Sequence, residues 1–262
     1  MTTQPAESPS LTESERKSQP EGMRTLAELA AYASREHSGA ALRHKTARGW
    51  EDISYAEVGS AAAEIAKGLI ALGIERGDRV SILANTRPEW TLCDLGALSA
   101  GATVAPIYQT NSPEECQYVL THSDARLVFC EEEQLGKIDQ IREHCPALEH
   151  VIAFDGSIEG SITLAELRAV GAEVADSALA ERTASVAPND IATLVYTSGT
   201  TGPPKGCMLT HENFLATMEM YHQQVDFDDT HTVFMFLPLA HSLARVTQMV
   251  ALEVGATIAY WT

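Results

Sequence analysis

A run of glycines and hydroxyl residues near the end of the chain, VYTSGTTGPPKG (195–206), has the composition of a phosphate-binding loop. Glycines let the backbone turn sharply and approach a ligand closely, and successive N–H groups in such a loop form a concavity that binds anions. The lysine adds a fixed positive charge beside the hydroxyl donors. The residues that could contact a phosphate are Thr197, Ser198, Gly199, Thr200, Thr201, Gly202 and Lys205.

The neighbouring segments favour a binding loop over a plain surface loop, which composition alone would suggest. A strand predicted at 191–196 precedes the run and a helix predicted at 211–222 follows it. Proteins of the α/β class bind ligands in loops at the carboxyl ends of strands. The run matches neither the Walker A motif nor G-x-G-x-x-G, because Lys205 stands between Pro204 and Gly206. The residues alone therefore predict a phosphate loop without assigning its class.

Other groups of polar residues carry weaker signals. His211 and Glu212 resemble the start of an H-E-x-x-H zinc motif, but position 215 is leucine, so we expect no zinc site. The acidic run 131–133 is interpreted as the solvated start of a helix, and 226–229 as a turn. Arg245 either braces its segment or faces solvent, and both alternatives stay open.

The overall composition excludes several classes of protein. Acidic residues number 36 and basic residues 18, a net charge of -18, which argues against nucleic acid or an anionic membrane surface as the main partner. Peripheral membrane contact and the oligomeric state stay open. The five cysteines form no C-x-x-C pair, which favours reduced thiols in a cytoplasmic protein. No apolar run reaches the roughly 18 residues of a membrane span.

Strands and helices alternate along residues 23–262, after a polar tail (1–22) that we expect to be disordered. Ser54 and Ser112 are predicted N-caps of helices, and Pro88 and Pro113 fit the first helical position. Strands are predicted at 79–83, 103–107, 126–130, 150–153, 191–196, 233–237 and 256–260. This alternation predicts an α/β fold with a mainly parallel sheet, or sheets, covered by helices in one structural unit.

The run TSGTTGPPKG closely resembles the phosphate-loop signature of the adenylate-forming (AMP-binding) superfamily, which includes acyl-CoA synthetases, peptide-synthetase adenylation domains and luciferases. Three further segments are similar and occur in the family's order over roughly 25–262. The segment FLPLAH looks most like the long-chain fatty acyl-CoA synthetase branch. Many members of that branch have a glutamate where this chain has Ala244, which leaves the length of the acid open. The three segments are LIALGIERGDRVSIL, GALSAGATVAPIYQTNSPEECQYVLTHSDARLVF and FMFLPLAHSLARV.

The resemblance implies that a long-chain fatty acid attacks ATP to give an acyl-adenylate, after which coenzyme A takes the acyl group. It implies that residues 197–205 hold the β- and γ-phosphates and that Thr200 is the hydroxyl residue associated with Mg²⁺. It also implies that His241 lines the acyl pocket near the reacting carboxylate. Two alternatives remain: a ligase that passes the acyl group to a carrier protein, and a non-catalytic remnant that binds phosphate.

Later signatures of the family, a Y-G-x-T-E stretch, a T-G-D aspartate and a small C-terminal lid domain with its lysine, do not occur in the chain. We therefore expect an N-terminal portion of a synthetase that is inactive in adenylation by itself. The predicted last strand should then lack a neighbour and leave apolar surface exposed.

Overall fold

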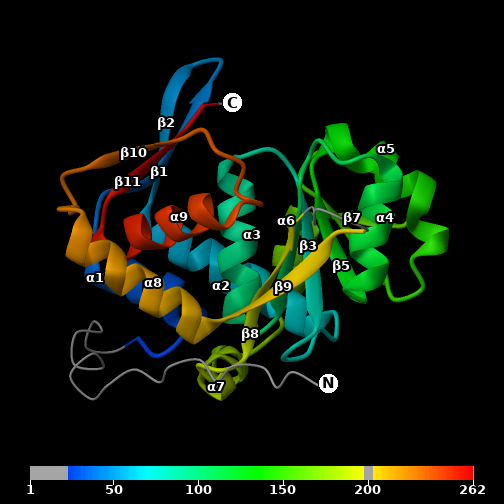
Figure 1. The fold of residues 1–262 in the computed structure, drawn as a ribbon, viewed down its shortest axis with the longest axis horizontal. Coiled ribbons are helices and arrows are strands. Elements are labelled where there is room, and N and C mark those ends of the chain that lie inside the picture. The colour runs from blue at the N-terminus through cyan, green and yellow to red at the C-terminus, as the bar shows by residue number, and fades with distance from the viewer. Residues whose placement is uncertain (1–22, 198–202, 262) are drawn as a thin grey trace, which may run out of the picture.

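The computed structural model describes residues 23–197 and 203–261, and its strands form two sheets (Figure 1). The larger sheet has the strand order β7-β6-β5-β3-β4-β8-β9. All neighbours in it are parallel except β8 and β9, which are antiparallel. Its strands are β3 (Arg79–Leu83), β4 (Thr103–Ile107), β5 (Ala125–Cys130), β6 (His150–Ala153), β7 (Ser161–Thr163), β8 (Ile191–Thr197) and β9 (Lys205–Thr210).

The smaller sheet has the order β10-β11-β1-β2, with strands β1 (Ala40–Thr46), β2 (Gly49–Ser54), β10 (Thr232–Met235) and β11 (Thr257–Tyr260). The expectation that the last strand lacks a neighbour is wrong, because β11 pairs in parallel with both β1 and β10. The edge strands of this sheet are β10 and β2. Aromatic side chains are exposed on β10 and just after it: Phe234 is 51% exposed and Phe236 is 72% exposed.

The helices form layers on the sheets. Figure 1 shows α2, α3 and α9 between the two sheets, with α4 and α5 on the opposite face of the larger sheet. One buried cluster joins side chains of both sheets, including Leu42 and Ile258 of the smaller and Val80 and Ile82 of the larger. The helices are α1 (Leu29–Glu36), α2 (Tyr55–Ala71), α3 (Pro88–Ser99), α4 (Pro113–His122), α5 (Glu132–Ile141), α6 (Leu164–Gly171), α7 (Asp176–Ser185), α8 (His211–Gln224) and α9 (Ser242–Val254), with short 3-10 turns η2 (Leu26–Glu28) and η3 (Arg142–His144).

Local signals begin these helices as predicted. Ser54 and Ser112 cap α2 and α4, each in a capping box with the glutamate three residues later. Pro88 and Pro113 occupy the first turns of α3 and α4. The mainly parallel α/β fold predicted from the alternation of elements is therefore confirmed.

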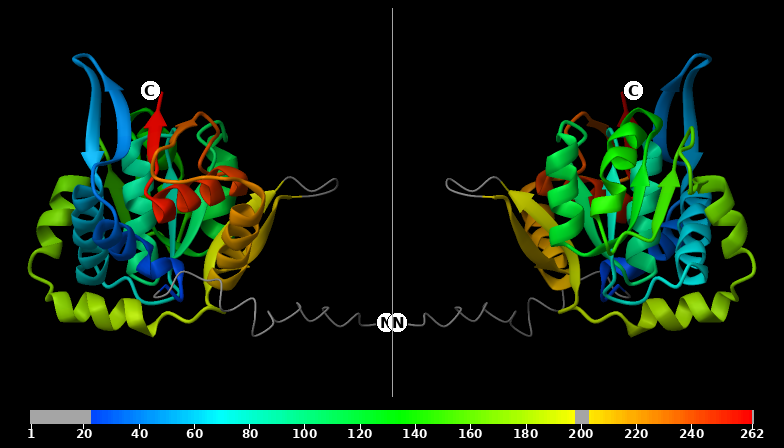
Figure 2. Two further views of the ribbon diagram at one scale, coloured as in Figure 1. Left: turned by 90° about the vertical axis from the view of Figure 1, so that its left-hand side faces the viewer. Right: turned by 90° about the vertical axis from the view of Figure 1, so that its right-hand side faces the viewer.

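The structure corrects the predicted surroundings of the glycine-rich run. The sequence predicts a strand, the run and then a helix, but β9 lies between the run and α8 and pairs antiparallel with β8. Figure 2 shows this hairpin at one side of the molecule, next to α8. Strand β9 is partly or fully exposed along its length, so it has no buried apolar pattern from which a strand could be predicted.

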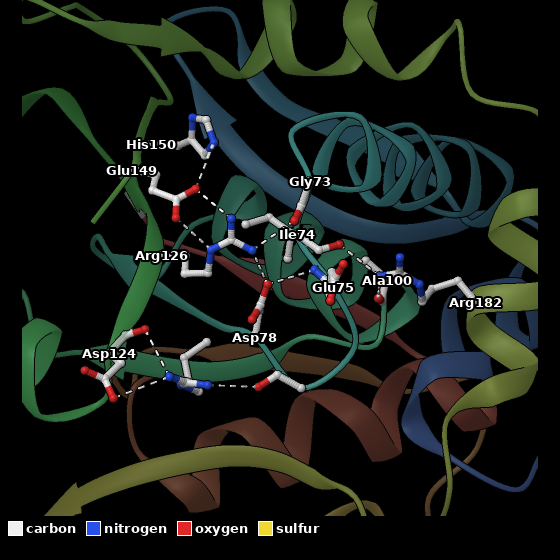
Figure 3. Close-up of polar contacts among 12 residues, drawn as sticks. Gly73, Ile74, Glu75, Asp78, Ala100, Asp124, Arg126, Glu149, His150 and Arg182 are labelled. Carbon is white, nitrogen blue, oxygen red and sulfur yellow. Dashed lines mark hydrogen bonds and ion pairs between the residues drawn. The ribbon is translucent and has the colours of Figure 1, made fainter. Parts of the chain in front are cut away.

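The amino ends of β3, β5 and β6 are joined by an arginine network (Figure 3). Arg126 forms ion pairs with Asp78 and Glu149 and donates a hydrogen bond to the carbonyl of Gly73 at 2.9 Å. These contacts connect the turn before β3 to the starts of β5 and β6. The network lies at the amino ends of the strands, whereas α/β proteins bind ligands at the carboxyl ends. We therefore assign it a structural role.

Candidate active site

The two ends of the glycine-rich run that the structure describes lie side by side. Thr197, the last residue of β8, pairs with Lys205, the first residue of β9, and both are exposed. A hydroxyl and an ammonium group at adjacent positions of an exposed hairpin fit an anionic ligand. The predicted contacts Ser198, Gly199, Thr200, Thr201 and Gly202, including the Mg²⁺-associated Thr200, lie outside the described residues.

His241 is the N-cap of α9. Its Nδ1 atom accepts a hydrogen bond from the backbone N–H of Leu243 at 3.2 Å. A neutral ring that accepts at Nδ1 carries its proton on Nε2, so Nε2–H can donate to a ligand. The side chain is exposed, and the N-terminus of α9 beside it carries the partial positive charge of the helix dipole. This end of α9 therefore favours a negatively charged group.

An apolar pocket of about 360 Å³ lies between β9, α8 and α9. Its wall includes Leu209 of β9, Phe214 of α8 and Leu243 of α9. The strand that begins with Lys205 and the helix capped by His241 thus supply walls of the same pocket. Sequence reasoning missed this wall, although Asn213, Thr217 and Tyr221 occur at the four-residue spacing of one helix face.

Arg245 lies one turn after His241 and is fully buried, which settles the alternatives left open above. Its guanidinium forms an ion pair with Asp94 of α3, with nitrogen–oxygen distances of 2.5 and 3.1 Å. It also donates a hydrogen bond to the hydroxyl of Thr193 on β8 at 2.5 Å. Arg245 therefore braces α9 against α3 and against the strand that leads into the glycine-rich run.

A larger pocket, of about 620 Å³, lies at the carboxyl ends of β3, β5 and β6. Glu131 in its wall is buried, so the prediction of a fully solvated acidic run is wrong at this position. Its carboxylate accepts hydrogen bonds from the backbone and side chain of Asn85 at 2.9 and 2.8 Å, and burial raises its pKa. Lys205, Thr197 and His241 do not line this pocket, although Pro238 in its wall accepts a hydrogen bond from the backbone N–H of His241 at 2.9 Å.

His211 has a structural contact in place of the rejected zinc motif. Its Nδ1 atom accepts a hydrogen bond from the backbone N–H of Leu26 at 3.2 Å, and burial lowers its pKa to about 4. Within residues 23–197 and 203–261, no helix is long and apolar enough to cross a membrane.

The hairpin carries an exposed threonine–lysine pair and also supplies one wall of the apolar pocket, and His241 caps α9, which supplies another wall. This arrangement suits a ligand that joins phosphate to an apolar group. Residues 30–262 match the family described as AMP-binding enzyme, and the chain belongs to this family.

Similar proteins include two curated long-chain-fatty-acid–CoA ligases. FadD15 of Mycobacterium bovis (strain ATCC BAA-935 / AF2122/97) is 38% identical over 215 residues, which cover 80% of this chain and 35% of that ligase. ACSBG1 of Bos taurus is 35% identical over 221 residues, covering 80% of this chain and 30% of that ligase. The chain therefore spans about a third of the length of these relatives.

Solved structures show the same fold. The anthranilate CoA ligase AuaEII in complex with anthranoyl-AMP has a TM-score of 0.76 at 22% identity, over 90% of this chain and 44% of that chain. The inhibitor-bound N-terminal domain of FACL13 from Mycobacterium tuberculosis has a TM-score of 0.71 at 25% identity, over 91% of this chain and 57% of that chain.

Proposed function

We propose that the complete gene product activates a long-chain fatty acid with ATP to an acyl-adenylate and transfers the acyl group to coenzyme A. The observation that carries this proposal is the pocket between β9, α8 and α9, because one strand of the phosphate hairpin forms a wall of it and His241 caps α9, another of its walls. Family membership and the names of the curated relatives support the reaction and the class of acid.

The pocket suits the alkyl chain of the acid. Its volume of about 360 Å³ falls within the usual range for small-molecule sites, about 300–1,000 Å³. Phe214 and Val246 contribute apolar surface to its wall. A fatty acid that buries its chain there can direct its carboxylate to the N-terminus of α9, where the helix dipole and Nε2–H of His241 favour negative charge.

The chemical difficulty of the first step is the approach of a carboxylate to a polyphosphate, because both are negative. In our proposal Lys205 and Thr197 hold the phosphates of ATP, and the charge of Lys205 stabilises the departing pyrophosphate. His241 orients the attacking carboxylate and supplies no nucleophile. Bound Mg²⁺ would neutralise part of the phosphate charge, and Thr200 remains the proposed hydroxyl near it.

Coenzyme A is the proposed acceptor because the curated relatives are CoA ligases. Transfer to a carrier protein would use the same first step. The acceptor is therefore tested separately from adenylation.

The test is ATP–pyrophosphate exchange by the complete gene product, with fatty acids of increasing length and with short and aromatic acids for comparison. We expect exchange that depends on a long-chain acid, followed by acyl-CoA formation when coenzyme A is added. Exchange without acyl-CoA formation would favour the carrier-protein alternative. A folded protein without exchange for any acid would support the non-catalytic alternative.

A further inference from the structure

The described residues of the phosphate hairpin contact helix α4, which carries no residue of the candidate site. Tyr118 of α4 donates a hydrogen bond from its hydroxyl to the backbone carbonyl of Pro204 at 2.8 Å. Pro204 directly precedes Lys205, so this bond holds the side of the hairpin that carries the lysine. Tyr118 and Pro204 lie 86 positions apart in the sequence, so the contact depends on the tertiary fold.

The other side of the hairpin contacts the same helix. Nδ1 of His122, one turn after Tyr118, shares a hydrogen bond with the hydroxyl of Tyr196 at 2.9 Å. Tyr196 directly precedes Thr197 on β8 and is 9% exposed. One helix therefore holds both strands of the hairpin, each at the residue next to the Thr197–Lys205 pair.

The three rings form a compact cluster. Tyr118 stacks on His122 with ring centroids 5.3 Å apart, and the ring of Tyr196 stands edge-on to both, at 6.3 and 5.7 Å. Gly206 lies on the ring of Tyr196, where a Cβ atom would come within 3.2 Å of Cζ. A side chain at this position would press β9 away from the cluster, so the glycine permits the close contact.

Helix α4 is a firm support for this cluster. Its first turn is fixed by the capping box of Ser112, and its inner face buries Cys116 and Val119. Nζ of Lys137 on α5 donates to the carbonyls of Gln109 and Asn111, each at 2.7 Å, and so holds the segment that leads into α4. Catalytic groups need supporting contacts of this kind, because displacements of about 1 Å lower rates substantially.

We propose that Tyr118, together with His122 and Tyr196, positions Lys205 and Thr197 for the phosphates of ATP. Tyr118 is a positioning residue and acts through the backbone of Pro204. The inference rests on the proposed function, to which it adds a second group of residues from an earlier part of the chain. In this inference the ring cluster supports ATP binding, and the pocket on the other side of β9 binds the fatty acid.

The test compares Tyr118→Phe with wild type in the complete gene product. The variant keeps the ring stack and loses only the hydroxyl, so the thermal midpoint should change little. We expect kcat/KM for ATP to fall about tenfold, from the loss of one hydrogen bond. The KM for the fatty acid should not change. Tyr32→Phe is the matched control, because the Tyr32 hydroxyl on α1 makes no hydrogen bond among the described residues.

Two results would overturn the inference. One is unchanged kinetics for ATP. The other is a parallel loss for ATP and fatty acid together with a lower thermal midpoint, which would indicate a structural role only. Tyr196→Phe provides a second, independent variant with the same expected selectivity for ATP. The double variant should lose less than the product of the single losses, because releasing one strand already frees the pair. Fully multiplicative losses would contradict this shared role.

Calorimetric titration with MgATP separates this inference from the proposed function. Weaker MgATP binding by Tyr118→Phe, in a protein whose wild type shows no exchange, would support the inference and refute the ligase reaction. Wild-type exchange with unaltered MgATP binding and kinetics in the variant would refute the inference alone. A wild type that neither binds MgATP nor catalyses exchange would refute both.

Discussion

Individual charged residues near the candidate site divide into two kinds by exposure. Lys205 is exposed at the start of β9, where a ligand can reach it. Arg245 has no exposed surface and is satisfied by Asp94 and Thr193. A cation that serves a ligand must be accessible, whereas a buried cation needs a protein partner to offset its desolvation. Exposure thus agrees with the prediction of Lys205 as a ligand-binding residue and decides that Arg245 braces its segment.

Replacing Lys205 tests whether this exposed lysine serves the ligand. We expect Lys205→Ala in the complete gene product to lower the adenylation rate by roughly 10²–10³, the usual effect of removing one preorganised charge-stabilising donor. The measurement is ATP–pyrophosphate exchange. Lys67→Ala is the control, because Lys67 on α2 pairs with the exposed Asp176 of α7 outside the candidate site and its loss should leave exchange unchanged. Wild-type exchange in Lys205→Ala would remove this lysine from the site.

Among the elements, α9 connects both halves of the candidate site. His241 is its N-cap, and Arg245, four residues later, reaches α3 and β8. The guanidinium carbon lies over the rings of Trp90 and Phe214, at 5.8 and 5.6 Å from their centroids, and Phe214 also lines the apolar pocket. Arg245 therefore connects α9 to α3 and to β8, the strand that leads into the phosphate hairpin.

Removing one partner of this pair should be costly, and removing both should cost less. We expect Arg245→Met alone to lower the free energy of unfolding by about 3–5 kcal/mol, because Asp94 becomes an uncompensated buried charge. The double variant Arg245→Met with Asp94→Leu should recover part of that loss. The Thr193 hydroxyl keeps its bond to the carbonyl of Val104 at 2.6 Å, whereas Nε2 of the buried Gln248 loses its 3.3 Å hydrogen bond to Asp94. Urea denaturation measures both. A double variant as unstable as the single one would contradict the ion-pair explanation.

For the whole molecule, contacts between distant parts of the chain set its response to pH. His211 at the start of α8 accepts a hydrogen bond from Leu26, 185 positions earlier, and burial lowers its pKa to about 4. The unfolded histidine has a pKa of about 6.5. The unfolded chain therefore takes up a proton between these values that the folded chain does not. Stability should fall as pH decreases from about 6.5 to 4, by roughly 3 kcal/mol from this group.

The measurement is urea denaturation at several pH values for wild type and His211→Asn, which can retain an acceptor for Leu26. We expect a smaller loss of stability in the variant across this interval. His222 provides the opposite case, because its hydrogen bond to Glu253 raises its pKa. Its contribution is present below the unfolded pKa and is lost as pH rises through the folded pKa, so His222→Gln should cost more at pH 6 than at pH 9. Identical pH slopes in wild type and His211→Asn would exclude His211 as the acid-sensitive group.

The sequence by itself determined the features that depend on neighbouring residues. Ser54 and Ser112 cap their helices because the capping partner lies three residues away, and β3 has its predicted bounds because a short apolar run follows a turn. The family motif likewise predicted Lys205 and His241 as site residues, since a motif is a local pattern. The alternation of these elements was enough to predict the parallel α/β architecture.

Only the tertiary structure decided which distant segments meet. Strand β9 forms because it pairs with β8. Glu131 and Arg245 can be buried because Asn85 donates hydrogen bonds to the first and Asp94 forms an ion pair with the second. The contact of Tyr118 with Pro204 and the pocket between β9, α8 and α9 likewise join residues without a common local pattern. The physical reason is that backbone propensity and capping act over about four residues, whereas burial and hydrogen-bond partners across the fold depend on how all the elements pack together.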